Sequence, residues 1–272
     1  MNPRIFLIQM TSTDDTNENF KKIIKYLHEA KSQSADLVAL PENFAFFGRD
    51  IDKIANLEKI QSLTQNFLRE NSKKYGLAIL AGGYPVASPD EEKAFNRVSI
   101  YSKLGEEIFN YDKMHLFDSE PGDGFSYKES KTTYPGHASP RVINISGIGR
   151  LSSVICYDLR FPEIFRKISE QQVDFIFVPA AFTKHTGIAH WEILLRARAI
   201  ENSVFIIAPG QTGVHDFEGK RKTFGNSMVV SPWGQVILNA GEKEGVFGLE
   251  IPFDQLSDVR QKIPSLNHRK IF

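Results

Sequence analysis

Strand-like and helix-like segments alternate along almost the whole chain. Residues 17–34 and 57–75 have apolar side chains at the spacing of a helix with one buried face, and Gly76 is expected to end the second helix. The short apolar run at residues 36–40, which ends before a proline, has the length and composition of a buried strand. This alternation predicts one α/β domain that spans residues 1–272.

The second half of the chain repeats the same pattern. Runs such as Phe-Ile-Phe-Val and Val-Phe-Ile-Ile are apolar on both faces, which implies that helices or another sheet cover both sides. Residues 117–140 form the longest stretch without periodicity, and loops of this length in compact domains are often functional. Further strands are expected at residues 4–10, 77–83, 96–101, 106–111, 151–155, 174–178, 203–208, 227–231, 235–239 and 245–251, and further helices at 162–172 and 189–202.

Charge and cysteine content exclude several classes of protein. The chain of 272 residues has 33 basic and 33 acidic side chains, whereas a general nucleic-acid binder usually has a basic excess. No apolar run reaches the roughly 20 residues of a membrane span, and the apolar run near the N-terminus is too short for a secretory signal. One cysteine allows neither an internal disulfide nor a multi-cysteine zinc site. We therefore expect a cytoplasmic protein with a free thiol.

The single cysteine, Cys156, lies between an expected strand and an expected helix. Pro162 suits the first turn of that helix. A residue at such a junction projects its side chain outward, the N–H groups that follow can bind an anion, and the position can lower the pKa of a thiol. A free cysteine is otherwise most often a small buried apolar residue. The location therefore makes Cys156 a candidate nucleophile.

A nucleophilic cysteine needs a base, and the usual base is histidine. None of the seven histidines has a local sequence that singles it out. Glu42, which follows a buried strand and precedes three phenylalanines, can act as the base if desolvation raises its pKa. Lys113 ends another strand, and its ammonium group could stabilise a thiolate and an oxyanion. Taken alone, each of these two side chains would more often be exposed to solvent.

The three residues lie in three motifs that occur in a characteristic order. The motifs are LPENF at Glu42, YDKMHLFD at Lys113 and ICYDLRFPE at Cys156. In their order and spacing they resemble the nitrilase superfamily of carbon–nitrogen hydrolases, and the likeness covers nearly the whole chain. The resemblance implies a Glu–Lys–Cys triad, a four-layer α-β-β-α sandwich and a thioester formed on the cysteine. It also matches Glu120 to a further glutamate that positions substrate, and it assigns the backbone N–H of Tyr157 to the oxyanion.

Further stretches are similar to one branch of that superfamily. They include HWEILLRARAIEN and GNSMVVSPWGQVI, and the branch contains amidases of deaminated glutathione and ω-amidases. The implied substrate is a small anionic amide, most simply deaminated glutathione, which would give 2-oxoglutarate and cysteinylglycine. No metal or cofactor is implied, and the helices near the nucleophile are expected to form a homodimer. The candidate substrate-binding residues are Phe125, Arg160, Thr183 and Lys184.

Other functions remain open on the sequence alone. The nearest alternatives are an ω-amidase acting on 2-oxoglutaramate and a hydrolase of N-carbamoyl compounds. A Cys–His acyltransferase would require one of the histidines as its base. An interaction protein that kept the fold but lost the activity would be expected to have lost Glu42, Lys113, Cys156 or Glu120, and all four are present.

Overall fold

The computed structural model describes residues 2–215 and 221–270. A six-stranded sheet of mixed direction contains the N-terminal half of the chain and one late strand. Its strands are β1 (Arg4–Gln9), β2 (Leu37–Ala39), β3 (Ala78–Ala87), β4 (Ala94–Tyr101), β5 (Glu107–Asp112) and β16 (Gly245–Glu250). They lie in the order β16-β1-β2-β3-β4-β5, with the parallel pairs β1–β2 and β2–β3 at the centre.

A second six-stranded sheet is built from the other half of the chain. Its strands are β8 (Ile143–Ile145), β9 (Gly149–Ser153), β10 (Phe175–Phe177), β11 (Phe205–Ala208), β14 (Met228–Val230) and β15 (Val236–Asn239). They lie in the order β15-β14-β11-β10-β9-β8. Two short antiparallel hairpins stand apart from both sheets, namely β6 (Asp118–Ser119) with β7 (Tyr127–Lys128), and β12 (Thr212–His215) with β13 (Arg221–Phe224).

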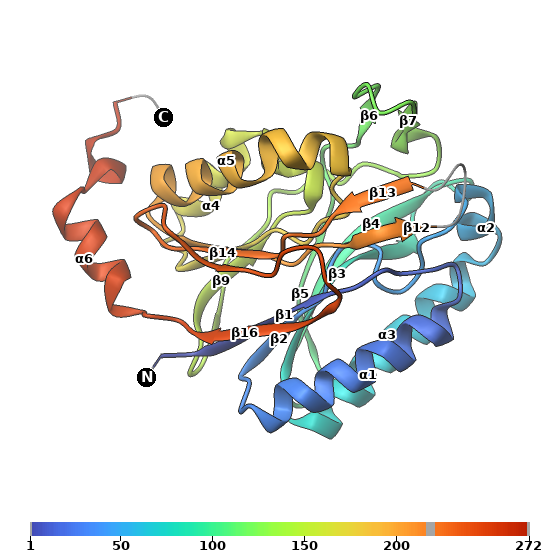
Figure 1. The fold of residues 1–272 in the computed structure, drawn as a ribbon, viewed down its shortest axis with the longest axis horizontal. Helices are drawn as coiled ribbons and strands as arrows, with labels where there is room; N and C mark the ends of the chain where they lie inside the picture. Colours follow the sequence, from blue (N-terminus) through green and yellow to red (C-terminus); the bar gives the residue numbers. More distant parts are fainter. Residues whose placement is uncertain (1, 216–220, 271–272) are drawn as a thin grey trace.

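Helices cover the outer faces of the two sheets, which gives four layers (Figure 1). α1 and α3 lie along the first sheet, and α4 and α5 lie along the second, while α6 packs at one end near the C-terminus. The helices are α1 (Thr16–Ser32), α2 (Asp50–Ala55), α3 (Leu57–Tyr75), α4 (Pro162–Ser169), α5 (Lys184–Asn202) and α6 (Asp254–Lys262), with 3₁₀ turns at Glu129–Lys131, Cys156–Arg160 and Ser265–His268. No helix in the described part of the chain is long and apolar enough to cross a bilayer.

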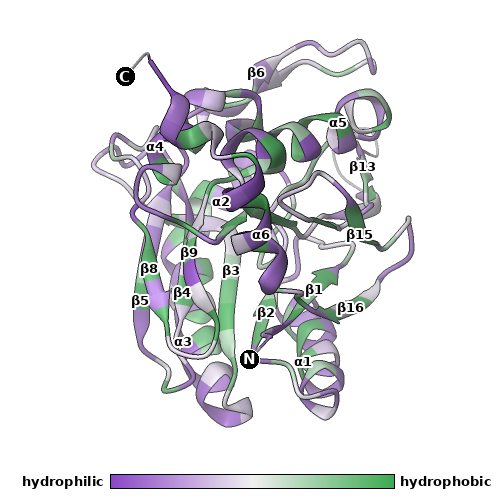
Figure 2. Cartoon of the chain, turned by 90° about the vertical axis from the view of Figure 1, so that its left-hand side faces the viewer, coloured by the Kyte–Doolittle hydropathy of each residue, from purple (hydrophilic) through white to green (hydrophobic). Residues whose placement is uncertain are grey.

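The strand β1 explains how both faces of a sheet become buried. Ile5 and Leu7 point into the core between the two sheets, whereas Phe6 and Ile8 point into the core beneath α1 and α3. Successive side chains on a strand point to opposite faces, so a continuous apolar run requires cover on both sides. The apolar colouring of the inner strands and the polar outer surfaces of the helices show this arrangement (Figure 2).

Most of the expected elements occur close to their predicted bounds. α3 ends at Tyr75, and Gly76 adopts a left-handed conformation with φ of 60° as its C-cap. α5 begins earlier than its apolar spacing indicates, because the Thr183 hydroxyl accepts the Thr186 N–H and caps the helix. The elements α2, α6, β8, β12 and β13 were not expected, and the long loop contains β6, β7 and one 3₁₀ turn.

Candidate active site

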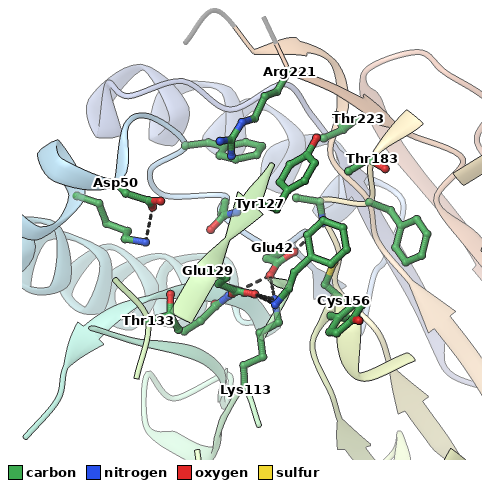
Figure 3. Close-up of a pocket in the computed structure, with 18 of the residues that line it drawn as sticks. Glu42, Asp50, Lys113, Tyr127, Glu129, Thr133, Cys156, Thr183, Arg221 and Thr223 are labelled. Carbon is green, nitrogen blue, oxygen red and sulfur yellow. Dashed lines mark hydrogen bonds and ion pairs between the residues drawn. The ribbon is translucent and has the colours of Figure 1, made fainter. Parts of the chain in front are cut away.

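Three side chains that are far apart in sequence meet at neighbouring strand ends. Glu42 follows β2, Lys113 follows β5 directly, and Cys156 follows β9. All three line one pocket, and residues that follow strands of both sheets contribute to it (Figure 3). Because side chains beyond the carboxyl ends of strands in α/β sheets are free of the ladder, such edges commonly carry binding and catalytic groups.

The turn that carries Cys156 is tightly held. Cys156 has φ of 45°, a left-handed conformation that is uncommon for a residue with a side chain. Its N–H donates to Pro179 O at 2.9 Å, and the buried carboxylate of Asp158 accepts the Ile155 N–H at 2.9 Å. Backbone strain of this kind persists where surrounding contacts over-determine it, and it is typical of functional sites.

Glu42 is buried among hydrogen-bond donors. Its Oε1 accepts from Lys113 Nζ at 3.0 Å and from Asn96 Nδ2 at 2.9 Å. Its Oε2 accepts the backbone N–H of Ala181 at 2.8 Å. Glu42 and the Cys156 thiol each shift the pKa of the other, so the carboxylate lies close to the sulfur. These contacts fix both carboxylate oxygens, so the side chain is oriented before any ligand arrives.

Lys113 lies between two carboxylates. Its Nζ donates to both oxygens of Glu129 at 2.9 Å and to Glu42 at 3.0 Å, and its side chain is only 2% exposed. Glu129 in turn accepts the Phe117 N–H at 2.6 Å. A buried ammonium group requires such partners, because an unpaired charge in this position would be strongly unfavourable.

These contacts determine the charges in the pocket. Burial acts to raise the pKa of Glu42, but Lys113, Cys156 and the Ala181 N–H outweigh it and lower that pKa. Burial acts to lower the pKa of Lys113, but Glu129 and Glu42 raise it well above its usual value. Burial and the neighbouring Glu42 raise the pKa of the Cys156 thiol. Glu42 therefore does not owe its role as a base to a pKa raised by desolvation, since its partners outweigh burial, and the position of Cys156 at the start of a turn does not lower the pKa of the thiol, since burial and Glu42 raise it.

The structure differs from the prediction at Glu120. This side chain is exposed, accepts a hydrogen bond from Ser126 at 3.2 Å and does not line the pocket. The β6–β7 hairpin carries the chain away from the pocket at Glu120 and returns it at Glu129, so that Glu129 occupies the place beside Lys113. The sequence signal that was missed is Glu129, a second carboxylate in the same long loop.

The predicted substrate-binding residues divide into two groups. Arg160 and Thr183 line the pocket, and the Arg160 guanidinium lies over the rings of Tyr157 and Phe182 at 5.7 and 5.2 Å. Lys184 instead pairs with Glu242 at 2.9 Å, and its side chain is 41% exposed to solvent and does not line the pocket. Phe125 also lies outside the pocket, where its ring contacts Tyr127. The ring of Tyr157 lines the pocket, and its N–H directly follows the cysteine.

The pocket also contains residues that sequence reasoning missed. Asn96 on β4 bonds to Glu42 and approaches Glu129 at 3.5 Å, while Arg221 and Lys222 on β13 line the pocket as well. In the sequence, Asn96 is only a polar residue within an apolar strand, and Arg221 and Lys222 are a basic pair in a segment for which no element was predicted. Within residues 2–215 and 221–270, no cluster of three or more His, Cys, Asp or Glu side chains could hold a metal ion.

The chain is similar in sequence and fold to several known proteins. The chain is 44% identical to deaminated glutathione amidase from Synechocystis sp. over 263 residues, which are 96% of each protein. The crystal structure of the C. elegans NitFhit protein superposes with a TM-score of 0.92 and 33% identity, covering 99% of this chain and 66% of that longer one. An amidase from Nesterenkonia sp. AN1, in which acrylamide has added to the active-site cysteine, gives a TM-score of 0.81 with 27% identity, covering 96% of this chain and 98% of that one.

The match to a family extends over almost the entire sequence. Residues 4–261 fit the family model described as carbon-nitrogen hydrolase, and this range includes both sheets and the whole lining of the pocket. The chain therefore belongs to the carbon-nitrogen hydrolase family.

Proposed function

We propose that this protein is an amidase that hydrolyses deaminated glutathione to 2-oxoglutarate and cysteinylglycine. The observation that carries the proposal is that a buried carboxylate, Glu42, a buried ammonium group, Lys113, and a partly buried thiol, Cys156, line one pocket. The relative from Synechocystis sp. has the name of this activity and matches the chain over nearly its full length. The family supplies the class of reaction, which is hydrolysis of a carbon–nitrogen bond.

In the first half-reaction the thiol attacks the amide carbon. Glu42, which is ionised because its pKa is lowered by Lys113 despite burial, accepts the Cys156 proton as the sulfur–carbon bond forms. The Lys113 ammonium and the Tyr157 N–H stabilise the oxyanion of the tetrahedral intermediate. Collapse breaks the carbon–nitrogen bond, Glu42 returns the proton to the leaving amine, and a thioester remains on Cys156.

In the second half-reaction water replaces the amine. Glu42 accepts a proton from water as the oxygen attacks the thioester carbon, and the same two donors hold the second oxyanion. The carbon–sulfur bond then breaks, the acid leaves, and the thiol recovers its proton from Glu42. Glu129 acts through Lys113 by keeping its ammonium charged and directed at the reacting carbonyl.

The assignment is tested with a panel of amides and with two variants. Cys156→Ala is expected to be folded and inactive, and Glu42→Gln is expected to lose at least about 10²-fold in kcat, typical of loss of a general base. Mass spectrometry of the products identifies the substrate, and a 2-oxoglutaryl adduct on Cys156 identifies the nucleophile. Cysteinylglycine release at the wild-type rate by Cys156→Ala would contradict the mechanism. Ammonia from 2-oxoglutaramate alone, or carbon dioxide from carbamoyl compounds, would reassign the substrate.

We also propose a cytoplasmic homodimer made of single-domain subunits. The two sheets share one apolar core, which supports a single domain. The lone cysteine suits a reducing compartment. Apolar side chains exposed on α5 and on the β14–β15 turn support association with a second copy: Ile193, Ile200 and Trp233. Cell fractionation tests the location, and the dimer is tested by a substitution on α5.

A further inference from the structure

Asn96 on β4 contacts both of the carboxylates that surround Lys113. Its Nδ2 donates to Glu42 Oε1 at 2.9 Å and lies 3.5 Å from Glu129 Oε1. The Lys113 ammonium group contacts the same two carboxylates (Figure 3). An amide turned the other way would direct its oxygen at two negatively charged groups and would be repelled. These neighbours therefore determine which end of the Asn96 amide faces Glu42.

The oxygen at the other end of this amide is buried without a partner. Among the described residues, no donor reaches Asn96 Oδ1. Buried polar atoms without a hydrogen bond are uncommon in folded proteins, and each one is unfavourable. An apolar side chain at this position would avoid that cost. The presence of an amide is therefore explained by what its nitrogen does for the two carboxylates.

A β-bulge makes room for Asn96 beside Glu42. The register of β3 against β4 shifts between residues 81 and 84, which places Gly83 at the irregularity. A Cβ on Gly83 would overlap Asn96 Oδ1 and would lie 3.2 Å from Glu42 Cγ. The Gly83 carbonyl accepts the Asn43 N–H at 2.6 Å, which holds the segment that carries Glu42 against the bulge. Glycine at this position therefore lets the amide and the carboxylate lie side by side.

The donors around Glu42 are distributed unevenly over its two oxygens. Oε1 accepts from Lys113 at 3.0 Å and from Asn96 at 2.9 Å, which occupies both of its lone pairs. Oε2 accepts the Ala181 N–H at 2.8 Å and keeps its second lone pair. Burial and Glu42 raise the pKa of the Cys156 thiol, and the Ala181 N–H acts against them, so the donor that bonds to Oε2 also lies near the sulfur.

We propose that Asn96 is a positioning residue that fills Oε1 of Glu42 and thereby makes Oε2 the oxygen that exchanges the proton. The Cys156 S–H bond breaks as an O–H bond forms at Oε2, and the electron pair left on sulfur forms the bond to the amide carbon. When the tetrahedral intermediate collapses, this O–H bond breaks and its proton leaves with the amine. The inference rests on the proposed function only in taking Glu42 as the base, so any amide that the wild-type protein hydrolyses serves for the test.

Asn96→Asp tests this role, because the replacement has the same shape but donates to Oε1 only while it is protonated. Two adjacent carboxylates share a proton, which raises the pKa at which the second one ionises. We expect kcat to be highest at acid pH and to fall about 10- to 100-fold as that proton is lost, the cost of a hydrogen bond to a charged group. The wild-type protein should have no such descending limb below pH 9, since the pKa values of Lys113 and Cys156 are both raised.

Asn110→Asp is the matched control for this variant. Asn110 lies on β5 in the same sheet, is exposed and does not line the pocket. The substitution makes the same change of group and charge, and it should leave the pH profile of kcat as in the wild type. Circular dichroism at each pH establishes that both variants are folded.

Asn96→Ala removes the donor without adding a charge, and it decides the point even if Asn96→Asp does not fold. We expect kcat to fall about 10- to 100-fold while KM changes less than about threefold, because the base loses its orientation and the substrate keeps its contacts. Loss of a donor to an ionised carboxylate should also raise the pKa of Glu42 and move the acid limb of kcat/KM to higher pH.

The possible outcomes separate the inference from the proposed function. A fall by the same factor at every pH in Asn96→Asp would give Asn96 a purely structural role. An unchanged or higher kcat in Asn96→Ala would show that Oε1 need not be filled. Either result overturns the inference and leaves the proposed function intact. If Glu42→Gln hydrolyses the amide at the wild-type rate, Glu42 is not the base, and the mechanism and the inference fail together. A descending limb confined to Asn96→Asp, with a slow Asn96→Ala, supports the inference.

Discussion

At the scale of single residues, the resting pocket holds a protonated Cys156 thiol and an ionised Glu42 carboxylate. Burial and Glu42 raise the pKa of Cys156, whereas Lys113 and its other partners lower the pKa of Glu42 against the effect of burial. The resting site is therefore a thiol beside an ionised base, and the proton moves when the sulfur attacks. Because Glu42, Lys113 and Cys156 interact strongly, their titrations belong to the group.

This charge state predicts a broad, flat pH profile. Glu42 with a lowered pKa remains a base at lower pH, so the acid limb of kcat/KM is expected below its ordinary value of 4.5. The pKa of Lys113 lies well above 10.5 and that of Cys156 well above 9.0, so neither group should produce a limb below pH 9. The measurement is kcat/KM for S-methylated deaminated glutathione, in which the thiol of the substrate is blocked and cannot titrate. Circular dichroism is the control for folding. A rise centred between pH 6 and 8 would indicate a low-pKa thiol and contradict the assignment.

The two glutamates of the long loop provide a matched comparison. Glu129→Gln removes the charge that holds Lys113, and kcat is expected to fall about 10- to 100-fold, less than the roughly 10²–10³-fold cost of losing an oxyanion donor outright, because Lys113 itself remains. Glu120→Gln changes an exposed side chain that lies outside the pocket and should leave kcat within about twofold. Steady-state kinetics of both variants decides the point, and the opposite ranking would restore the original prediction for Glu120.

At the scale of elements, hydrophobic periodicity and motifs predicted the strands that carry Glu42, Lys113 and Cys156. They could not predict which loop glutamate reaches Lys113. The strands β6 and β7 have two residues each, too short to show periodicity, and their pairing decides where the loop returns. The β12–β13 hairpin that carries Arg221 was missed for a related reason, since polar and basic residues dominate it. The side-chain positions in both segments depend on contacts that are distant in sequence.

Asp158 joins two of the elements that form the site. This fully buried carboxylate accepts the Ile155 N–H and the Tyr111 hydroxyl, each at 2.9 Å, and the His115 N–H and Nδ1 at 3.1 and 2.7 Å. It therefore ties the turn of Cys156 to the end of β5, where Lys113 lies. Four contacts to one carboxylate fix the relative position of nucleophile and ammonium group.

Asp158→Asn should consequently affect both stability and turnover. An amide replaces one acceptor oxygen with a donor, so the free energy of unfolding is expected to fall by about 1–3 kcal/mol, the usual cost of lost hydrogen bonds to a buried charge. We also expect kcat to fall while KM changes little, because the reacting groups lose their alignment. Urea unfolding and steady-state kinetics measure the two effects. Glu163→Gln, an exposed carboxylate on α4, is the control, and equal behaviour of the two variants would refute the role of Asp158.

At the scale of the whole molecule, the four layers bring the strand ends of both sheets to one pocket. The first sheet supplies the carboxylate and the ammonium, and the second supplies the thiol. The apolar runs predicted that both faces of the sheets would be covered, and the resemblance supplied the layer order. On the outside, Ile193 and Ile200 on α5 are 69% and 52% exposed, and Trp233 beside them is 59% exposed. A Cβ on Gly234 would meet Ile200, so the helix and the turn form one surface.

We expect this apolar surface of α5 and the β14–β15 turn to pack against a second copy of the chain. Ile193→Glu introduces a charge that a dry interface cannot accommodate, and a central contact typically contributes about 2 kcal/mol or more, which corresponds to at least about a 30-fold weaker dimer. Leu104→Glu, which is 66% exposed in the wild type and lies on a turn outside α5, should leave the dimer unchanged. Sedimentation velocity over a range of concentrations measures the dissociation constant of each variant.

Dissociation of the dimer should also lower the activity, because α5 contacts the turn that carries Cys156. The buried Arg198 donates from Nε and Nη2 to Leu159 O at 3.0 and 2.9 Å, and Leu159 lies three residues after Cys156. A dimer interface that fixes the position of α5 therefore also fixes the position of the Cys156 sulfur. For Ile193→Glu, specific activity should fall on dilution in step with the fraction of dimer, whereas Leu104→Glu should keep constant activity. A wild-type protein that sediments as a monomer at full activity would show that α5 needs no second subunit to position Cys156.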